Sequence, residues 1–221
     1  MNYEIERDGF AIVSGVLSPD ERSKLLSALG LAPKAGHRGL LAEPAVRELA
    51  RNGAMLGLVR PHVPEAPMPV RAIFFDKSPE ANWVVAWHQD LTIEVRARTD
   101  LPGFGPWSVK DGVPHVQPPI ELMEQMLAVR LHFDDADASN GALRVLPGSH
   151  QLGRLSIGRI HELRAQHSEV LCTVSAGDAL LMRPLLLHAS NRSAKPSHRR
   201  VLHIEYAGFQ LPPGLVWHEA Y

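Results

Sequence analysis

The chain has 221 residues, a length typical of one domain, and its 45% hydrophobic and 21% charged residues are ordinary for a globular protein. Its 23 basic and 24 acidic residues give a formal charge of −1, which argues against a general binder of nucleic acid or of an anionic membrane. A single cysteine, Cys172, an amino-terminal stretch unlike a signal peptide and a longest apolar stretch too short to cross a bilayer together predict a cytoplasmic protein.

Residues 1–69 are expected to form a partly helical segment that supports the rest of the chain. A short strand is predicted at 10–13. Ser18 is a typical helix N-cap, followed by a proline and a glutamate that favour a first turn, and Gly30 is a typical helix end. A second short helix is predicted over 43–52, with the following glycine as its stop.

From residue 70 onward the sequence changes to short apolar runs bounded by turn residues, which is typical of strands. The predicted strands are 70–75, 84–93, 126–133, 142–146, 170–174, 179–182, 185–190 and 199–207. Residues 96–119, which contain several prolines and glycines, are expected to form one irregular loop of the kind that often covers a binding site. We therefore predict one domain, 1–221, that is mainly β with flanking helices and has a jelly-roll or sandwich core at 70–207.

Two histidines and a carboxylate are candidates for a metal site. Because side chains alternate along a strand, His88 and Asp90 should share one face, and the apolar run 185–190 presents His188 together with Ser190. Two histidines and one carboxylate bind non-haem Fe(II) and leave three positions open, where a keto acid and O₂ can bind. A His-X-Asp triplet also occurs by chance, so these three residues alone do not establish a metal site.

Arg199 adds a cation at a suitable distance along the chain. In the strand 199–207, alternation places the apolar residues on one face, which should pack under the helices, and leaves Arg199 on the other. There its guanidinium can bind a ligand carboxylate through two parallel hydrogen bonds. The same alternation also fits a strand with one buried face and one solvated face.

As a set, these segments resemble the phytanoyl-CoA dioxygenase family of Fe(II)/2-oxoglutarate oxygenases. The resemblance rests on His88-Gln89-Asp90, on the stretch from Asn140-Gly141 to Leu146-Pro147-Gly148-Ser149-His150, on His188-Ala189-Ser190 and on Arg199. It covers roughly residues 70–207 and implies a double-stranded β-helix, a cupin-like core. It also implies that His88, Asp90 and His188 bind iron, and that Arg199, assisted by Ser190, holds the distal carboxylate of 2-oxoglutarate.

The resemblance further implies hydroxylation of an unactivated C–H bond of a small-molecule metabolite, with O₂ consumed and succinate and CO₂ released. Asp90 favours hydroxylation over halogenation, because related halogenases have a small residue in its place. Neither nucleic acid nor a membrane is expected as a partner, and the sequence does not indicate the oligomeric state or the substrate.

Arg130 departs from some relatives, which have an aromatic residue near the cofactor at that position. If Arg130 points into the barrel, the pocket gains a cation and suits an anionic substrate; alternatively, Arg130 pairs with an acidic neighbour. The candidates for the substrate pocket are Arg71, Lys77, Asn82 and Gln89, which precede or flank the metal strand. The histidines at 37, 62, 115, 161 and 167 are expected to be solvated.

Two other functions use the same core. One is a cupin-like metalloenzyme without 2-oxoglutarate, such as a ring-cleaving dioxygenase or an isomerase, which would need the metal ligands but not Arg199. The other is a non-catalytic binding protein that has lost the metal. A nucleic-acid demethylase is disfavoured because the sequence has no basic stripe.

Overall fold

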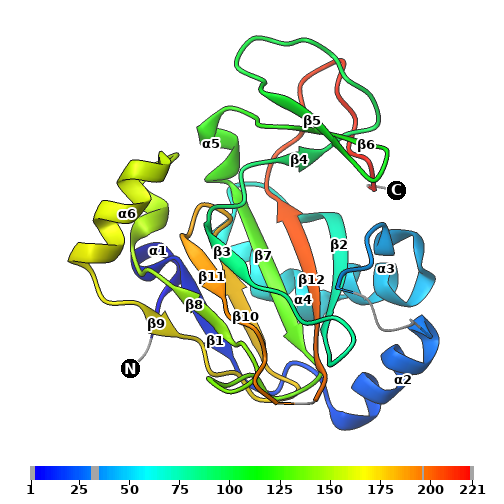
Figure 1. The fold of residues 1–221 in the computed structure, drawn as a ribbon. Helices are drawn as coiled ribbons and strands as arrows, with labels where there is room; N and C mark the ends of the chain where they lie inside the picture. The colour runs from blue at the N-terminus through cyan, green and yellow to red at the C-terminus, as the bar shows by residue number, and fades with distance from the viewer. Residues whose placement is uncertain (1–2, 31–34, 196, 220–221) are drawn as a thin grey trace.

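Two antiparallel sheets that face each other form the framework of the molecule (Figure 1). The computed structural model describes residues 3–30, 35–195 and 197–219. The larger sheet contains, in spatial order, β1 (Phe10–Val13), β10 (Ala179–Met182), β7 (Met126–His132), β12 (Arg199–Ala207) and β2 (Met68–Lys77). The smaller sheet contains β3 (Val85–His88), β11 (His188–Ser190), β8 (Leu143–Val145) and β9 (Val170–Leu171). Residues of both sheets, such as Leu180 and Val145, share one buried cluster, which confirms the predicted jelly-roll class.

Helices cover the outer face of the larger sheet. They are α2 (Pro19–Leu29), α3 (Pro44–Arg51) and α4 (Gly53–Val59), with the 3-10 turn η1 (Leu40–Ala42) beside them. Leu202, Ile204 and Tyr206 of β12 are fully buried against this layer, where they join Val46 of α3 in one hydrophobic cluster. The Tyr206 hydroxyl donates a hydrogen bond to the carbonyl oxygen of Ala50 at 2.9 Å, so the polar end of this buried ring is satisfied.

The alternation along β12 leaves its polar residues facing inward, as predicted. Arg199, His203 and Glu205 line a cavity between the sheets. Arg200 instead forms an ion pair with Asp134 at 2.7 Å on the other side of the strand. One strand thus supplies both the core under the helices and a polar wall of the cavity.

The amino-terminal helix begins and ends as predicted. Ser18 and Glu21 form a reciprocal capping box at the start of α2, and Gly30 ends it with a left-handed φ of 52°. The second predicted helix matches α3, which ends at Arg51 just before Gly53, but Gly53 itself begins another helix. The Asn52 side chain accepts a backbone hydrogen bond and caps a new helix, α4.

The prediction of an irregular loop at 96–119 is wrong. Within this segment, β5 (Trp107–Lys110) and β6 (Val113–Val116) form a hairpin, which pairs with β4 (Ile93–Glu94), just before the segment, in a third sheet. Asp111 and Gly112, both with positive φ, connect β5 to β6 in the tight turn that an Asp-Gly pair favours. This β5–β6 hairpin stands over one end of the two-sheet framework (Figure 1).

Two further strands are shorter than expected. The segments predicted as strands 84–93 and 185–190 are reduced to β3, which ends at His88, and β11, which begins at His188. Asp90 therefore lies beyond the end of β3, where its backbone N–H donates to the carbonyl oxygen of Pro184 at 2.9 Å. The chain turn after β3, rather than one shared strand face, places Asp90 near His88.

The remaining helical elements were not anticipated. They are α1 (Ile5–Asp8), η2 (Arg60–His62), α5 (Ile120–Met123), η3 (Ser149–Leu152) and α6 (Ile157–Gln166). Of the helices found in the described residues, none has the length and apolar character needed to cross a bilayer.

Candidate metal and cosubstrate site

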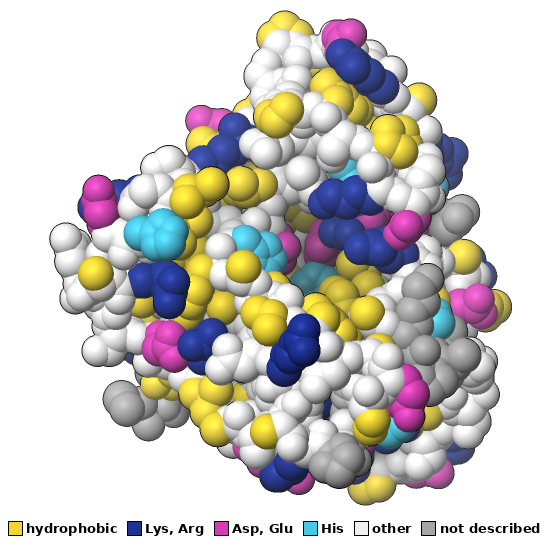
Figure 2. All heavy atoms as spheres, in the orientation of Figure 1, with side chains coloured by type: hydrophobic (Ala, Val, Ile, Leu, Met, Phe, Trp, Pro, Cys, Tyr) yellow, Lys and Arg dark blue, Asp and Glu magenta, His cyan; other side chains and the backbone are white. Residues whose placement is uncertain are grey.

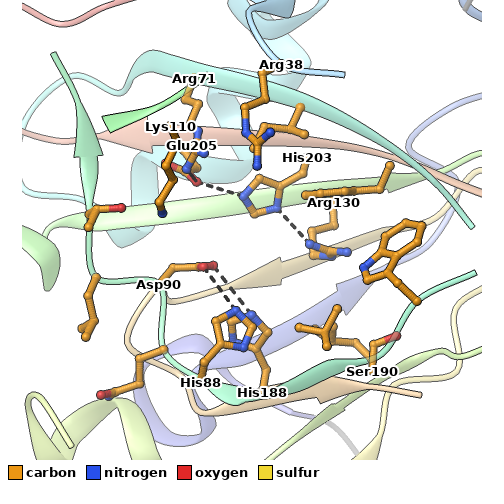
Figure 3. Close-up of a pocket in the computed structure, with 18 of the residues that line it drawn as sticks. Arg38, Arg71, His88, Asp90, Lys110, Arg130, His188, Ser190, His203 and Glu205 are labelled. Carbon is orange, nitrogen blue, oxygen red and sulfur yellow. Dashed lines mark hydrogen bonds and ion pairs between the residues drawn. The ribbon is translucent and has the colours of Figure 1, made fainter. Parts of the chain in front are cut away.

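Three side chains, from the paired strands β3 and β11 and from the turn after β3, converge at the bottom of the cavity (Figure 3). His88 ends β3, His188 begins β11, and the two residues are directly paired across the antiparallel ladder. Asp90 Oδ1 lies 3.6 Å from Nε2 of His88, and Asp90 Oδ2 lies 3.7 Å from Nε2 of His188. One ligand atom from each residue lies within 4.8 Å of the other two, so one ion can contact all three.

The backbone fixes both imidazole rings. Nδ1 of His88 lies 2.8 Å from the carbonyl oxygen of Ala86, and Nδ1 of His188 lies 2.8 Å from that of Leu186. A carbonyl oxygen only accepts, so each Nδ1 carries the proton and each Nε2 presents its lone pair to the centre. A hydrogen bond from the non-coordinating nitrogen to a carbonyl is the usual support of a metal-bound histidine.

The electrostatics of His188 and Asp90 also suit a cation. Burial lowers the pKa of His188 to about 4, so this ring is neutral and able to coordinate a metal at neutral pH. Desolvation would raise the pKa of Asp90, but the adjacent His188 and His88 outweigh it and hold that pKa well below its usual range. An ionised carboxylate beside two imidazole nitrogens is the donor set of non-haem Fe(II) sites.

The cavity that contains the three residues has a volume of about 350 Å³. In Figure 2 it is a hollow in which histidine and acidic side chains lie at the bottom and basic side chains gather along one edge. Its lining comprises Arg38, Arg71, Ile73, Phe75, Trp83, Val85, His88, Gln89, Asp90, Leu91, Thr92, Lys110, Arg130, Leu143, His188, Ser190, Arg199, His203 and Glu205. A space of this size suits small molecules.

Two buried guanidinium groups lie in the cavity wall. Arg199 is 3% exposed, and its Nε has no hydrogen-bond partner among the described residues. Burial, reinforced by repulsion from Arg130, lowers the pKa of Arg199 to about 10, which still leaves it charged at neutral pH. A buried cation with an unsatisfied donor requires an anionic partner, and a ligand carboxylate in the cavity would supply one.

Arg130 also points into the barrel, the first of its two predicted positions. Its Nη1 donates to Nδ1 of His203 at 3.0 Å, its guanidinium lies over the Phe75 ring, and its Nε is buried without a partner among the described residues. Since His203 accepts at Nδ1, its Nε2–H donates to Oε1 of Glu205 at 3.2 Å. The partner of Arg130 is thus a histidine rather than the acidic neighbour that was the alternative.

Ser190 lines the cavity, but its hydroxyl is already engaged. Its Oγ donates to the carbonyl oxygen of Gly141 at 2.7 Å and accepts from Nζ of Lys77, also at 2.7 Å. Lys77 is directly opposite Arg199 on the neighbouring strand and is fully buried. Burial, with repulsion from Arg199 and Arg130, lowers the pKa of Lys77 to about 7. Lys77 supports Ser190 from behind the cavity wall and is not itself in the lining.

Asn82 and Gln89 make structural contacts. The Asn82 amide exchanges two hydrogen bonds with the backbone of Ser193 and is not in the cavity lining. Gln89 lines the cavity, but its amide donates to the carbonyls of Gly153 and Leu185 and accepts from the Leu155 backbone. Both amides therefore hold loops in place.

Arg71 takes part in a buried polar chain that sequence reasoning missed. Its Nη1 lies 3.1 Å from Oε1 of Glu205, and its Nε lies 2.7 Å from Oε1 of Glu94. Nε2 of His115 lies 3.1 Å from the same Glu94 oxygen. The prediction that His115 is solvated is wrong: it is 0% exposed, because β6 packs it against the end of the barrel. The ion pairs of Arg71 with Glu94 and Glu205 join residues that are far apart in the chain, so they are not visible in the sequence.

A family model described as phytanoyl-CoA dioxygenase (PhyH) matches residues 5–201. A search of curated proteins finds no match. The matched stretch includes the three candidate metal ligands and Arg199.

Several solved structures share the fold. AviO1 from Streptomyces viridochromogenes Tue57 is 24% identical, with a TM-score of 0.66, and the match covers 95% of this chain and 94% of AviO1. EctD from S. alaskensis, solved with 2-oxoglutarate and 5-hydroxyectoine, is 18% identical with a TM-score of 0.72, covering 98% of this chain and 80% of EctD. SnoN, described as a non-heme alpha ketoglutarate dependent epimerase from nogalamycin biosynthesis, is 17% identical with a TM-score of 0.65. The match covers 91% of this chain and 78% of SnoN.

Proposed function

Because the chain belongs to the phytanoyl-CoA dioxygenase family, we propose that it is a non-haem Fe(II)- and 2-oxoglutarate-dependent dioxygenase. Its reaction would convert 2-oxoglutarate and O₂ to succinate and CO₂ while hydroxylating a C–H bond of a small-molecule metabolite. One oxygen atom would enter succinate and the other the product. Its location in the cytoplasm stays a prediction of the sequence.

The residues of the cavity have distinct proposed tasks. Nε2 of His88, Nε2 of His188 and a carboxylate oxygen of Asp90 would hold iron, which when bound supplies the redox chemistry of O₂ activation. The carbonyl oxygens of Ala86 and Leu186 keep both rings in the coordinating tautomer. Arg199 would bind the distal carboxylate of 2-oxoglutarate.

The observation that carries this proposal is the buried Arg199, whose Nε has no partner among the described residues, in the same cavity as the His88, Asp90 and His188 set. A metal site alone fits many enzymes. A buried cation facing the same space adds the requirement for an anionic ligand, and 2-oxoglutarate, a dicarboxylate, has one carboxylate for the metal and one for Arg199. Arg130 lines the same cavity and increases its preference for an anion.

Two alternatives remain as competing functions. A cupin-like metalloenzyme without 2-oxoglutarate would use the same three ligands and would not need Arg199. A non-catalytic binding protein would need neither the metal ligands nor Arg199, although the three donor atoms lie close enough together to hold one ion. Within the 2-oxoglutarate enzymes, the fold match to the epimerase SnoN means that the product itself must be identified.

The test uses purified protein with Fe(II), ascorbate and O₂. We expect conversion of 2-oxoglutarate to succinate, and a visible charge-transfer band when Fe(II) and 2-oxoglutarate are combined without O₂. His188→Ala should abolish both signals, because it removes one of the three residues that, among those described, come close enough together to hold one ion.

His161→Ala provides a matched control, since this exposed histidine lies on α6 outside the cavity lining. It should leave the band and the succinate yield unchanged. If the wild-type protein binds iron but shows neither the band nor succinate formation, the dioxygenase proposal fails and the cupin-like alternative is favoured.

A further inference from the structure

One exposed cation, Lys110, lines the cavity on the side away from Ser190. Figure 3 shows Lys110 reaching into the cavity on the same side of the metal ligands as Arg71 and Glu205, whereas Ser190 lies on the opposite side. Lys110 ends strand β5, so the β5–β6 hairpin carries this side chain over the cavity. Its ammonium group has no ion-pair partner among the described residues.

The other cations on that wall are already paired. Arg71 is bound by Glu94 and Glu205, and Glu205 also accepts a hydrogen bond from His203. The single positive charge of Arg71 is shared between these two carboxylates, and no ion pair joins Glu205 to Lys110 among the described residues. Lys110 is therefore the cation on this wall that remains available for a ligand.

Arg38 and the hairpin turn form a fixed rim beside Lys110. Nη1 of Arg38 lies 2.6 Å from Oδ2 of Asp111, the residue after Lys110. The preceding residue, His37, exchanges two backbone hydrogen bonds with Phe74 of β2, at 2.8 and 2.9 Å. The Arg38–Asp111 ion pair thus joins the hairpin to the edge of the larger sheet, and Arg38 itself lines the cavity.

We infer that the open end of the cavity, under Lys110 and Arg38, binds an anionic group of the substrate, so that the substrate is a small metabolite with a carboxylate or a phosphate. This inference rests on the proposed function, because it assigns the opposite end to 2-oxoglutarate. A contact between the exposed Lys110 ammonium and an anionic group contributes affinity and helps to orient the substrate over the metal ligands. Carboxylate and phosphate share this chemistry, and the test separates them.

The experiment measures binding to the anaerobic complex of the protein with Fe(II) and 2-oxoglutarate. The probes are matched pairs: hydroxy and amino acids with their carboxamides, and sugar phosphates with the parent sugars. Perturbation of the charge-transfer band gives the dissociation constant of each compound. We expect the acidic member of at least one pair to bind about 10-fold or more tightly than its neutral partner, the scale of one charge-assisted hydrogen bond. The pair that responds shows whether carboxylate or phosphate is recognised.

Substitutions at Lys110 then test whether this residue causes the preference for acidic compounds. The preference is the dissociation constant of the neutral compound divided by that of its acidic partner. We expect this ratio to fall close to one in Lys110→Ala, to drop below one in Lys110→Glu and to stay near the wild-type value in Lys110→Arg. Lys24→Glu, which makes the same charge change on the exposed face of α2, should keep the wild-type preference. Rising NaCl should reduce the preference in wild type, because this contact is open to screening by salt.

The outcomes separate this inference from the proposed function. If no charge-transfer band forms with Fe(II) and 2-oxoglutarate, the proposed function fails. If the band forms but responds better to neutral compounds, or to no acidic compound, the inference about the substrate is overturned while the dioxygenase assignment stands. An unchanged preference in Lys110→Ala likewise overturns it.

Discussion

Arg199 is the residue that separates the proposed enzyme from a metalloenzyme without a keto-acid cosubstrate. It is buried, and its Nε has no partner among the described residues. In Arg199→Met, which keeps most of the volume but removes the charge, we expect the dissociation constant of 2-oxoglutarate to rise by about 100-fold, because losing one partner of a buried charge pair costs about 2–5 kcal/mol. Titration of the charge-transfer band measures this constant, and metal analysis should find the same iron content as in wild type.

Arg200→Met is the matched control for this prediction. Arg200 is the next residue on β12, but it pairs with Asp134 on the other side of the strand. Its substitution should leave the affinity for 2-oxoglutarate unchanged. If Arg199→Met retains wild-type affinity, the distal carboxylate does not bind at position 199 and the cupin-like alternative gains support.

At the residue scale, the sequence could predict which side chains converge but not what holds them. His88, His188 and Arg199 were identifiable because polar groups are unusual in apolar strands. Their supports are backbone carbonyls, such as Leu186 O behind His188, and backbone groups carry no residue-type signal. Asn82 illustrates the opposite error: it is close to the metal strand in sequence, yet its amide binds the Ser193 backbone outside the cavity lining.

At the element scale, the turn before β8 must fit closely against the end of β11. Gly141 has a φ of 75°, and a Cβ added there would lie 2.4 Å from the carbonyl oxygen of Asn191. β8 and β11 are paired, with Leu143 opposite Ser190. The clash in the variant would therefore push β8 away from β11, the strand that carries His188. We expect Gly141→Ala to lower the free energy of unfolding by about 2–4 kcal/mol, as measured by urea denaturation.

Gly39→Ala isolates the conformational part of that loss. Gly39 also has a φ of 75°, but an added Cβ would meet nothing within 4 Å. It should cost only about 1–2 kcal/mol, the penalty for a left-handed residue with a side chain. Equal losses in the two variants would mean that the approach to Asn191 contributes nothing to the stability of the β8–β11 pair.

Strand boundaries and the β5–β6 hairpin were the elements that the sequence did not predict well. Short strands such as β8 and β11 are defined by their partners, so their ends depend on tertiary pairing rather than on local composition. The hairpin was hidden by the prolines and glycines of 96–119, although the Asp111-Gly112 turn is a recognisable signal. The alternation along β12, in contrast, was predictable because one face packs under helices and the other lines the cavity.

At the scale of the whole molecule, Glu219 joins segments that are far apart in the chain. Its Oε2 accepts a hydrogen bond from the backbone N–H of Leu41 at 2.9 Å and from that of Ala72 at 3.4 Å, which connects the carboxy-terminal segment to η1 and β2. The side chain is buried, and its Oε1 has no partner among the described residues. Burial, with repulsion from Glu94, raises the pKa of Glu219 to about 7.

This raised pKa predicts how stability changes with pH. Between about pH 4.5 and 7 the folded state holds a proton on Glu219 that the unfolded state releases, so the contribution of this group to stability is complete below pH 4.5 and is lost as the pH rises through 7. Glu219→Gln resembles the protonated acid and does not titrate. Its free energy of unfolding should match that of wild type near pH 4 and exceed it by up to about 3 kcal/mol at pH 8.

Urea unfolding at a series of pH values measures this difference. Glu43→Gln, at an exposed position, provides the control and should run parallel to wild type across the range. A difference between Glu219→Gln and wild type that stays constant from pH 4 to 8 would show that Glu219 does not change its protonation on unfolding. A difference that grows with pH would establish that the carboxy-terminal segment is held most firmly when this acid is neutral.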